Sequence, residues 1–303
     1  MKNNRLCWAA DISLLLVAAL WGFTFVIIKE ALAELPPFTF NAVRFILASL
    51  FMCLAFPRRL ASLGKEGLKA GILIGLALLA GYSLQTLGMV YSTASNAGFL
   101  TGLTVVFVPL LTMVVTRSLP ESGVLAGVAF AVLGLGLLTL GDSFLFNYGD
   151  LLLLLCAVAF ATHLILVGHY GRKFDATALT AVQILTAAAG SSLLAFGLET
   201  FPLLPPRFSP PVWQALLITS LLATCLAYFV LMYMQQYTTP VRMAIVLTGE
   251  PAFAALFACL LLKETLGPRA LAGGGFVLLG MLTVELAPLL KDNARQRLED
   301  RAR

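Results

Sequence analysis

Long apolar stretches follow one another along almost the whole chain, and short polar connections separate them. The stretches are continuous and do not alternate, which indicates helices, because backbone groups in lipid must be satisfied within each segment. A helix needs roughly 20 apolar residues to cross the ~30 Å hydrocarbon layer. The sequence therefore predicts an all-α polytopic membrane protein with ten spans, at residues 11–33, 38–56, 68–90, 95–116, 123–141, 150–170, 177–198, 212–235, 241–262 and 268–287.

The second half of the chain repeats the first. Identical residues at matching positions under one offset are Tyr82 and Tyr228, Tyr91 and Tyr237, Thr93 and Thr239, and Phe107 and Phe253. A slightly smaller offset near the amino terminus places Asp11 on Asp150. Because each half holds five spans, an odd number, the halves cross the membrane in opposite directions. The pattern predicts two inverted five-helix repeats, residues 11–141 and 150–287, with a substrate site where they meet, an arrangement typical of transporters.

Composition and charge agree with a chain whose solvent is lipid. Of the 303 residues, 60% are hydrophobic and 12% are charged, and the mean hydropathy is +0.94. Fifteen lysines and arginines fall on the side that holds both chain ends, four fall on the other side, and Arg44 lies inside a span. The positive-inside rule assigns both termini to the cytoplasmic face of the cell (inner) membrane. Residues 1–10 form a short cytoplasmic N-terminus, and residues 288–303 form a basic tail that lies against anionic lipid and not nucleic acid.

Two charged residues inside spans are the sharpest functional candidates. Glu250 lies ~15 Å into the ninth span at 1.5 Å per residue, where a charge costs about 2.5–3.5 kcal/mol on insertion scales. A carboxyl that gains and loses a proton at that depth suits proton coupling, and the alternative is a protonated acid that fixes a kink. Arg44 lies ~10 Å into the second span. It either snorkels to the interface, pairs with an acid or contacts a substrate carboxylate.

Polar and aromatic residues recur at helical spacing on several spans. Such stripes usually reflect helix packing, but their symmetric places make a cavity lining the functional alternative. Such a pocket suits a small, largely apolar or zwitterionic molecule. The predicted lining is Trp21, Thr24, Arg44, Tyr82, Gln85, Asn96, Thr101, His163, Tyr228 and Glu250. Pro109 and Pro251 interrupt the fourth and ninth spans at related positions and are predicted hinges, with packing kinks as the alternative interpretation.

No arrangement typical of catalysis is visible in the sequence. It has no Gly-rich phosphate loop, no His/Cys set at metal-ligand spacing and no nucleophile with a base at a recognisable spacing. The five cysteines are scattered singly, as expected of small packing residues. The sequence thus predicts no catalytic residue, no cofactor and no metal site, and it indicates that the protein is not an enzyme. A polytopic membrane enzyme or a non-transporting sensor is the alternative from a different class.

Several motifs resemble the EamA-type transporters of the drug/metabolite transporter superfamily. They are Ala19-Leu20-Trp21-Gly22, Asn41-Ala42-Val43-Arg44-Phe45, the segment from Tyr91 to Thr101, and the segment from Glu250-Pro251 to Lys263-Glu264. The resemblance covers residues 11–287 and implies a ten-helix bundle around a central cavity that opens alternately to either side. The chain departs from the family after the fourth span, where Arg117-Ser118 stands in place of the usual acidic residue.

The resemblance also implies a function. Members of this family move amino acids, other metabolites and drugs, most often outward and in some cases with proton exchange. The expectation is therefore an exporter of small amphipathic metabolites such as amino acids, whose partners are its substrate, the lipid bilayer and protons. A sugar-phosphate or nucleotide-sugar exchanger is the second interpretation. It ranks lower because it needs several buried lysines or arginines, whereas only Arg44 lies inside a span.

Overall fold

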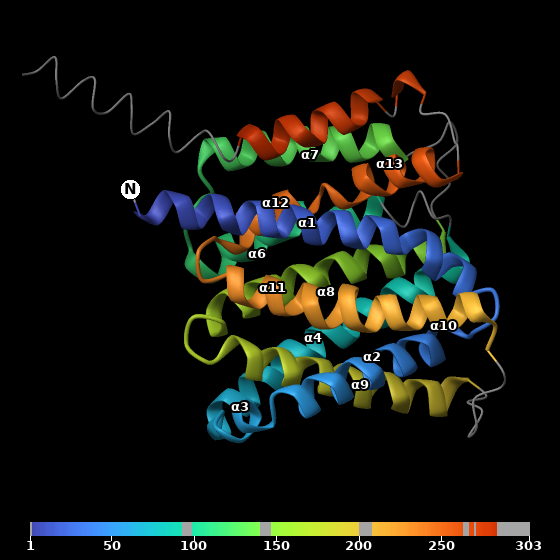
Figure 1. Ribbon diagram of the computed structural model, residues 1–303. Coiled ribbons are helices and arrows are strands. Elements are labelled where there is room, and N and C mark those ends of the chain that lie inside the picture. The colour runs from blue at the N-terminus through green and yellow to red at the C-terminus, as the bar shows by residue number, and fades with distance from the viewer. Residues whose placement is uncertain are drawn as a thin grey trace, which may run out of the picture.

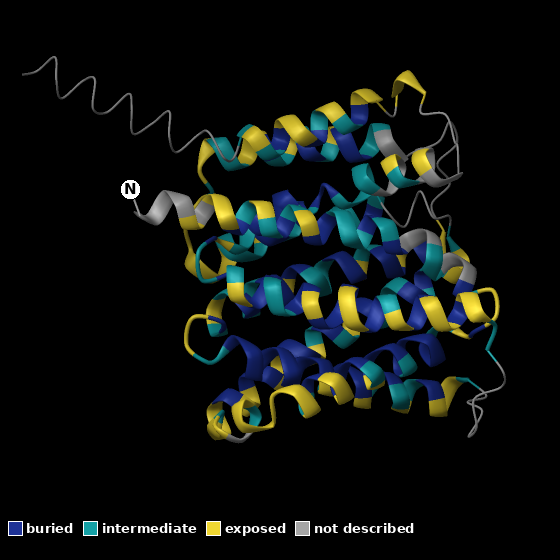
Figure 2. Cartoon of the chain, in the orientation of Figure 1, coloured by how far each residue is buried: buried dark blue, intermediate teal, exposed yellow. Residues whose placement is uncertain are grey.

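The computed structural model describes residues 2–92, 99–139, 147–199, 208–262, 267–269 and 271–283, and the regular structure within those ranges is helical. The helices lie side by side in a bundle and run in alternate directions between its two ends (Figure 1). The first helix begins and the last described helix ends at the same end of the bundle. Buried residues fill the interior, while many leucines on the outside are exposed, as a lipid-facing surface requires (Figure 2).

The predicted spans coincide with single helices or with two or three consecutive helical segments. The elements are α1 (Lys2–Ala31), α2 (Pro37–Ala55), α3 (Pro57–Ala61), α4 (Gly64–Tyr91), α6 (Thr104–Thr116), α7 (Ser122–Thr139), α8 (Tyr148–Tyr170), α9 (Ala176–Leu198), α10 (Pro210–Leu217), the π-helix η1 (Ile218–Leu226), α11 (Ala227–Met234), α12 (Pro240–Leu247) and α13 (Glu250–Leu262). In addition, residues 99–102 precede α6, and residues 271–283 form the last described helix. The prediction of an all-α chain is confirmed for the described part of the sequence.

Six helical stretches within the described ranges are long and apolar enough to cross a membrane. They are Pro37–Ala55, Gly64–Tyr91, Phe99–Thr116, Tyr148–Tyr170, Ala176–Leu198 and Pro210–Met234. The first, fifth and tenth predicted spans contain the shorter apolar helices Trp8–Thr24, Ser122–Leu137 and Leu271–Thr283. The ninth is divided between α12 and α13, so neither part reaches the length of a full span.

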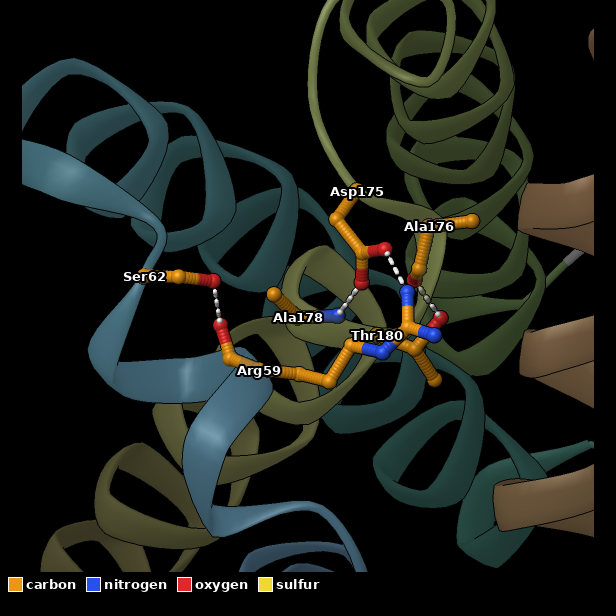
Figure 3. A network of polar contacts seen from close by, with 6 residues as sticks. All are labelled: Arg59, Ser62, Asp175, Ala176, Ala178 and Thr180. Carbon is orange, nitrogen blue, oxygen red and sulfur yellow. Dashed lines mark hydrogen bonds and ion pairs between the residues drawn. The ribbon is translucent and has the colours of Figure 1, made fainter.

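Carboxylates join α9 to α2 at one end and to α3, which follows α2, at the other end. Glu199, which follows α9, accepts hydrogen bonds from the backbone N–H groups of Phe38 (2.8 Å) and Thr39 (2.7 Å) at the start of α2. A negative charge is stabilised there by the helix dipole and by unpaired N–H groups. At the opposite end, Asp175 caps α9 and pairs with Arg59 of α3 at 2.6 Å (Figure 3). The two long helices are therefore held in a fixed register.

A single turn interrupts both the fourth and the ninth predicted spans. In the fourth, the break lies at Leu103, just before α6. In the ninth, Thr248 and Gly249 form a turn between α12 and α13. The offset that places Tyr82 on Tyr228 also places Leu103 on Gly249, so the two breaks occupy matching positions.

The two predicted hinge prolines differ in their relation to these breaks. Pro251 is the second residue of α13 and directly follows its break. Pro109 lies buried inside α6, which stays helical through it, and the interruption lies six residues earlier. A proline within a membrane helix is tolerated where neighbouring helices fill the space around it. The matching feature of the two halves is therefore the turn and not the proline.

Residues that the sequence offset relates lie against each other. The Tyr228 hydroxyl donates to the Tyr82 hydroxyl at 3.1 Å, and the rings of Phe130 and Phe276 stack with centroids 6.2 Å apart. Self-complementary contacts of this kind are expected where two similar units meet about a two-fold axis.

The contact between α7 and the last described helix has the same symmetry. A Cβ on Gly134 would lie 2.7 Å from the Gly273 carbonyl oxygen, and a Cβ on Gly280 would lie 2.7 Å from that of Gly127. The offset converts Gly127 to Gly273 and Gly134 to Gly280, so each contact is the counterpart of the other. Only glycine allows the backbones to approach this closely.

Candidate functional site

A cavity of about 130 Å³ lies among α1, α2, α4, α8 and α11 and beside both helix breaks. Nine of the ten residues predicted to line a cavity line this one, namely Trp21, Thr24, Arg44, Tyr82, Gln85, Thr101, His163, Tyr228 and Glu250. The tenth, Asn96, lies outside the described residues. The structure thus brings residues from seven predicted spans together around one space. Their contact with a substrate remains a prediction.

Arg44 is buried, with 3% of its surface exposed, and its guanidinium points into the bundle. Its Nε donates to the Thr224 hydroxyl at 2.8 Å, and its Nη2 donates to the Tyr82 hydroxyl at 3.1 Å. The guanidinium carbon lies 4.8 Å from the centroid of the Tyr82 ring, a cation–π distance. These contacts contradict the interpretation that Arg44 snorkels to the interface, because they hold the side chain against η1 and α4 beside the cavity.

The charge of Arg44 is not neutralised by an ion pair within the described part of the chain. The ion pairs found there join Arg59 to Asp175, Lys69 to Glu66 and Arg242 to Asp11. A buried charge without a counter-ion is costly. It is retained where hydrogen bonds support it and where a ligand of opposite charge binds.

Glu250 supplies a carboxyl group to the same cavity. It is the first residue of α13, directly after the helix break, so its carboxylate lies at the positive end of a helix dipole. No described residue forms a hydrogen bond with it, whereas the charge of Arg44 acts on it through space. The side chain is partly exposed to the cavity. The cavity lining therefore includes one guanidinium and one carboxyl group that can gain or lose a proton.

Aromatic rings also line the cavity. Trp21 and Tyr228 lie with their centroids 5.5 Å apart, and Tyr82 meets Phe160 edge-on at 5.5 Å. The His163 ring meets Tyr228 edge-on at 5.6 Å, while its Nε2 is 2.8 Å from the Gln183 side-chain oxygen. Such a wall accepts apolar or aromatic groups in preferred edge-to-face geometries.

Several lining residues were not among the predicted set. Asn41 precedes Arg44 by one helical turn on α2, and its amide donates to the Thr86 hydroxyl at 3.0 Å. Phe160 precedes His163 by one turn on α8. Each of the two lies three residues before a predicted lining residue and therefore on the same helix face. This spacing is the sequence signal that could have identified both.

Each half of the chain begins with an aspartate that binds the other half. Asp11 of α1 pairs with Arg242 of α12 at 2.5 Å, and both side chains are less than one fifth exposed. Asp150 of α8 accepts a hydrogen bond from Ser92, which follows α4. The first helices of the two halves, α1 and α8, start at opposite ends of the bundle (Figure 1). The contacts therefore join the halves at different ends.

Proteins with similar sequences carry the name of transporter. An uncharacterized transporter of Archaeoglobus fulgidus is 35% identical over 277 residues, which are 91% of this chain and 86% of that protein. An uncharacterized transporter of Bacillus subtilis is 24% identical over 275 residues, covering 88% and 92% of the two chains. A protein of known crystal structure aligns with a TM-score of 0.77 at 16% identity and covers 92% of this chain and 97% of its own, which shows a common fold.

The EamA-like transporter family matches the sequence twice, over residues 8–140 and 147–286. Within the described residues of these two ranges, six helices are long and apolar enough to cross a membrane. Since the family profile and a relative of 35% identity each cover most of the sequence, the chain belongs to the EamA-like transporter family and is an integral, multi-pass membrane transporter.

Proposed function

We propose that this protein is an alternating-access exporter of small amphipathic metabolites, with amino acids as the substrate class. Its ten helices form two inverted five-helix repeats around the central cavity. Two observations support this architecture, namely the matching helix breaks at Leu103 and Gly249 and the contacts between repeat partners such as Tyr82 and Tyr228. Broken helices in corresponding positions of two halves are typical of transport sites.

The observation that carries the substrate class is that Arg44 and Glu250 line the same aromatic-walled cavity. A zwitterion complements this arrangement, because its carboxylate suits the guanidinium and its ammonium suits the carboxylate. An apolar or aromatic side chain then contacts Trp21 and Tyr228. Every polar group of the ligand thus has a partner, which a buried site demands.

A sugar-phosphate or nucleotide-sugar is a poorer fit. Such a ligand carries two or more negative charges, whereas Arg44 is the one lysine or arginine among the described lining residues. Glu250 would repel the phosphate further.

Proton coupling and orientation complete the proposal. Glu250 is the proton-coupling group, because it faces the cavity at a helix break and has no protein hydrogen-bond partner among the described residues. Both termini lie in the cytoplasm of a cell (inner) membrane protein, in accordance with the distribution of lysine and arginine. Transport is outward.

Uptake of radiolabelled amino acids into proteoliposomes tests the proposal directly. The wild-type protein is expected to show saturable flux of an apolar or aromatic amino acid, and Arg44→Met is expected to reduce that flux about 100-fold by removing a charged hydrogen-bond donor. The control is Arg58→Gln, which changes an exposed arginine of α3 far from the cavity. Saturable flux of another class of metabolite, with none for any amino acid, would overturn the substrate assignment.

A further inference from the structure

The span that contains Tyr228 is not a uniform α-helix. Nine of its residues, Ile218–Leu226, form the π-helix η1 between α10 and α11. Extended π-helical turns are rare, and where they occur they are frequently found at functional sites. None of the described residues of η1 lines the cavity, but two of them, Ala223 and Thr224, accept hydrogen bonds from the lining residues Trp21 and Arg44. The π-helix therefore lies directly behind the cavity wall and contacts the side chains that form it.

The π-helix changes which carbonyl groups are used within the span. At its end, the backbone N–H of Ala227 bonds to the carbonyl oxygens of Leu222 and Thr224 and passes over that of Ala223. The Ala223 oxygen instead accepts hydrogen bonds from Trp21 Nε1 at 2.8 Å and from Arg44 Nη2 at 3.4 Å. In a regular α-helix, Ala227 would occupy this oxygen. The π-helical geometry thus directs a main-chain acceptor toward two cavity residues.

Thr224 makes the second contact of η1 with Arg44. It is fully buried, and its hydroxyl oxygen accepts from Arg44 Nε at 2.8 Å. With Nε bound by Thr224 and Nη2 bound by Tyr82 and Ala223, the plane of the guanidinium is fixed. The remaining nitrogen, Nη1, has no acceptor among the described residues, and Arg44 lines the cavity. The fixed plane therefore presents one donor edge to a ligand.

We propose that η1 is a specificity-determining element of this transporter, in which Thr224 is the positioning residue that holds Arg44 for a substrate carboxylate. This inference rests on the proposed function, since it assumes that Arg44 binds the carboxylate. It adds that recognition depends on a threonine that does not itself touch the substrate. A guanidinium held at two of its three nitrogens loses less freedom when a ligand binds, so the restraint increases affinity for the carboxylate selectively.

The chain offers matched variants for a test. Thr224→Val removes the acceptor at nearly constant volume, whereas Thr224→Ser retains it. Thr219→Val is the control for the substitution itself, because Thr219 is also fully buried in η1 but its hydroxyl donates to the Ala215 carbonyl oxygen of the same span. The probes are L-phenylalanine and L-phenylalaninamide, which share a side chain and an ammonium group and differ in the carboxylate.

Binding of both probes to the purified full-length protein is measured by titration calorimetry. The wild-type protein is expected to bind L-phenylalanine more tightly than the amide. Thr224→Val is expected to weaken L-phenylalanine binding about tenfold, as expected for loss of one hydrogen bond to a charged group, and to leave amide binding unchanged. Thr224→Ser and Thr219→Val are expected to keep the wild-type ratio of the two affinities.

The outcomes separate the two proposals. A wild-type preference for the carboxylate that survives in Thr224→Val overturns the role of η1 and leaves the proposed function intact. Equal weakening of both probes in Thr224→Val also overturns it, because general damage to the cavity does not distinguish the carboxylate. A wild-type protein that binds neither probe, or binds both equally, contradicts the proposed function itself.

Discussion

Arg44 and Glu250 are held inside the bundle by different means. Arg44 donates hydrogen bonds to the Thr224 hydroxyl, the Tyr82 hydroxyl and the Ala223 carbonyl oxygen, so oriented dipoles stabilise its charge. Glu250 has the dipole of α13 and the distant charge of Arg44. A carboxylate with so few partners changes its protonation more readily than one that is paired.

This difference predicts the behaviour of Glu250→Gln. The ionised carboxylate attracts a substrate ammonium, so wild-type binding is expected to weaken as pH falls and protons occupy Glu250. The glutamine variant lacks the titrating group, and its transport is expected to be reduced at least tenfold and to lose the pH dependence between about pH 5.5 and 8. Flux into proteoliposomes at fixed pH values measures both effects. A variant with the same pH profile as the wild-type protein would remove Glu250 from any coupling role.

The cavity residues differ in how visible they are in the sequence. Arg44 and Glu250 stand out because a charge in an apolar run is rare, and Tyr82 and Tyr228 stand out because they recur at one offset. Thr224 gives no such signal, since a threonine within a membrane helix usually bonds to its own backbone. Its role depends on contact with α2, 180 residues away in the sequence. Pairwise contacts of that kind follow from the three-dimensional packing.

At the level of helices, the ends of α2 and α9 show how a membrane bundle is fixed at its surfaces. The Glu199 carboxylate accepts hydrogen bonds from two backbone N–H groups at the start of α2, those of Phe38 and Thr39. It accepts a third from the Thr39 hydroxyl. Caps of this type satisfy donors that would otherwise face the edge of the lipid. The contact also joins two helices from different halves of the chain.

The cap predicts a loss of stability in Glu199→Ala. Removing the carboxylate leaves the N–H groups of Phe38 and Thr39 without this acceptor, which is expected to cost about 1–2 kcal/mol. Thermal unfolding of the purified protein in detergent is expected to shift to lower temperature by several degrees. The control is Glu66→Gln, whose pair with Lys69 is largely exposed and is expected to leave the midpoint unchanged. Equal midpoints for Glu199→Ala and the wild-type protein would contradict the capping role.

The interruptions within spans were only partly visible in the sequence. Pro251 marks a break, but Pro109 lies inside a continuous helix, because proline disturbs the backbone only where its neighbours do not compensate. The π-helix η1 has no composition signal at all, since Ile218–Leu226 is as apolar as its flanks. Its geometry is stabilised by the hydrogen bonds that one of its carbonyl groups, that of Ala223, accepts from Trp21 of α1 and Arg44 of α2.

At the level of the whole molecule, the internal repeat was the most informative feature of the sequence. It predicted which residues of the two halves correspond, and the structure places several such partners in contact, among them Phe130 with Phe276. Apolar length predicted the helices because lipid allows few other structures. The contacts that join the halves at each end of the bundle could not be predicted, because Asp11 and Asp150 correspond in sequence while their partners, Arg242 and Ser92, do not.

The two aspartates thus bind the other half in different ways, Asp11 through an ion pair with Arg242 and Asp150 through a hydrogen bond from Ser92. The proposed alternating-access cycle requires α1 and α12 to separate at the Asp11–Arg242 pair when the cavity opens to that side. Asp11→Asn is therefore expected to favour the state that is open at this end. The reporter is a cysteine introduced at Thr24 in the cavity, labelled with an impermeant maleimide added from the side of the chain ends. In the Asp11→Asn background it is expected to react about tenfold faster, which corresponds to a shift of ~1.4 kcal/mol in the equilibrium between the two states. The double variant Asp11→Arg with Arg242→Asp restores the attraction and is expected to restore the slow rate. If the neutral variant and the exchanged pair react at the same rate, the ion pair does not control this end of the cavity, and the two ends must be closed by helix packing instead.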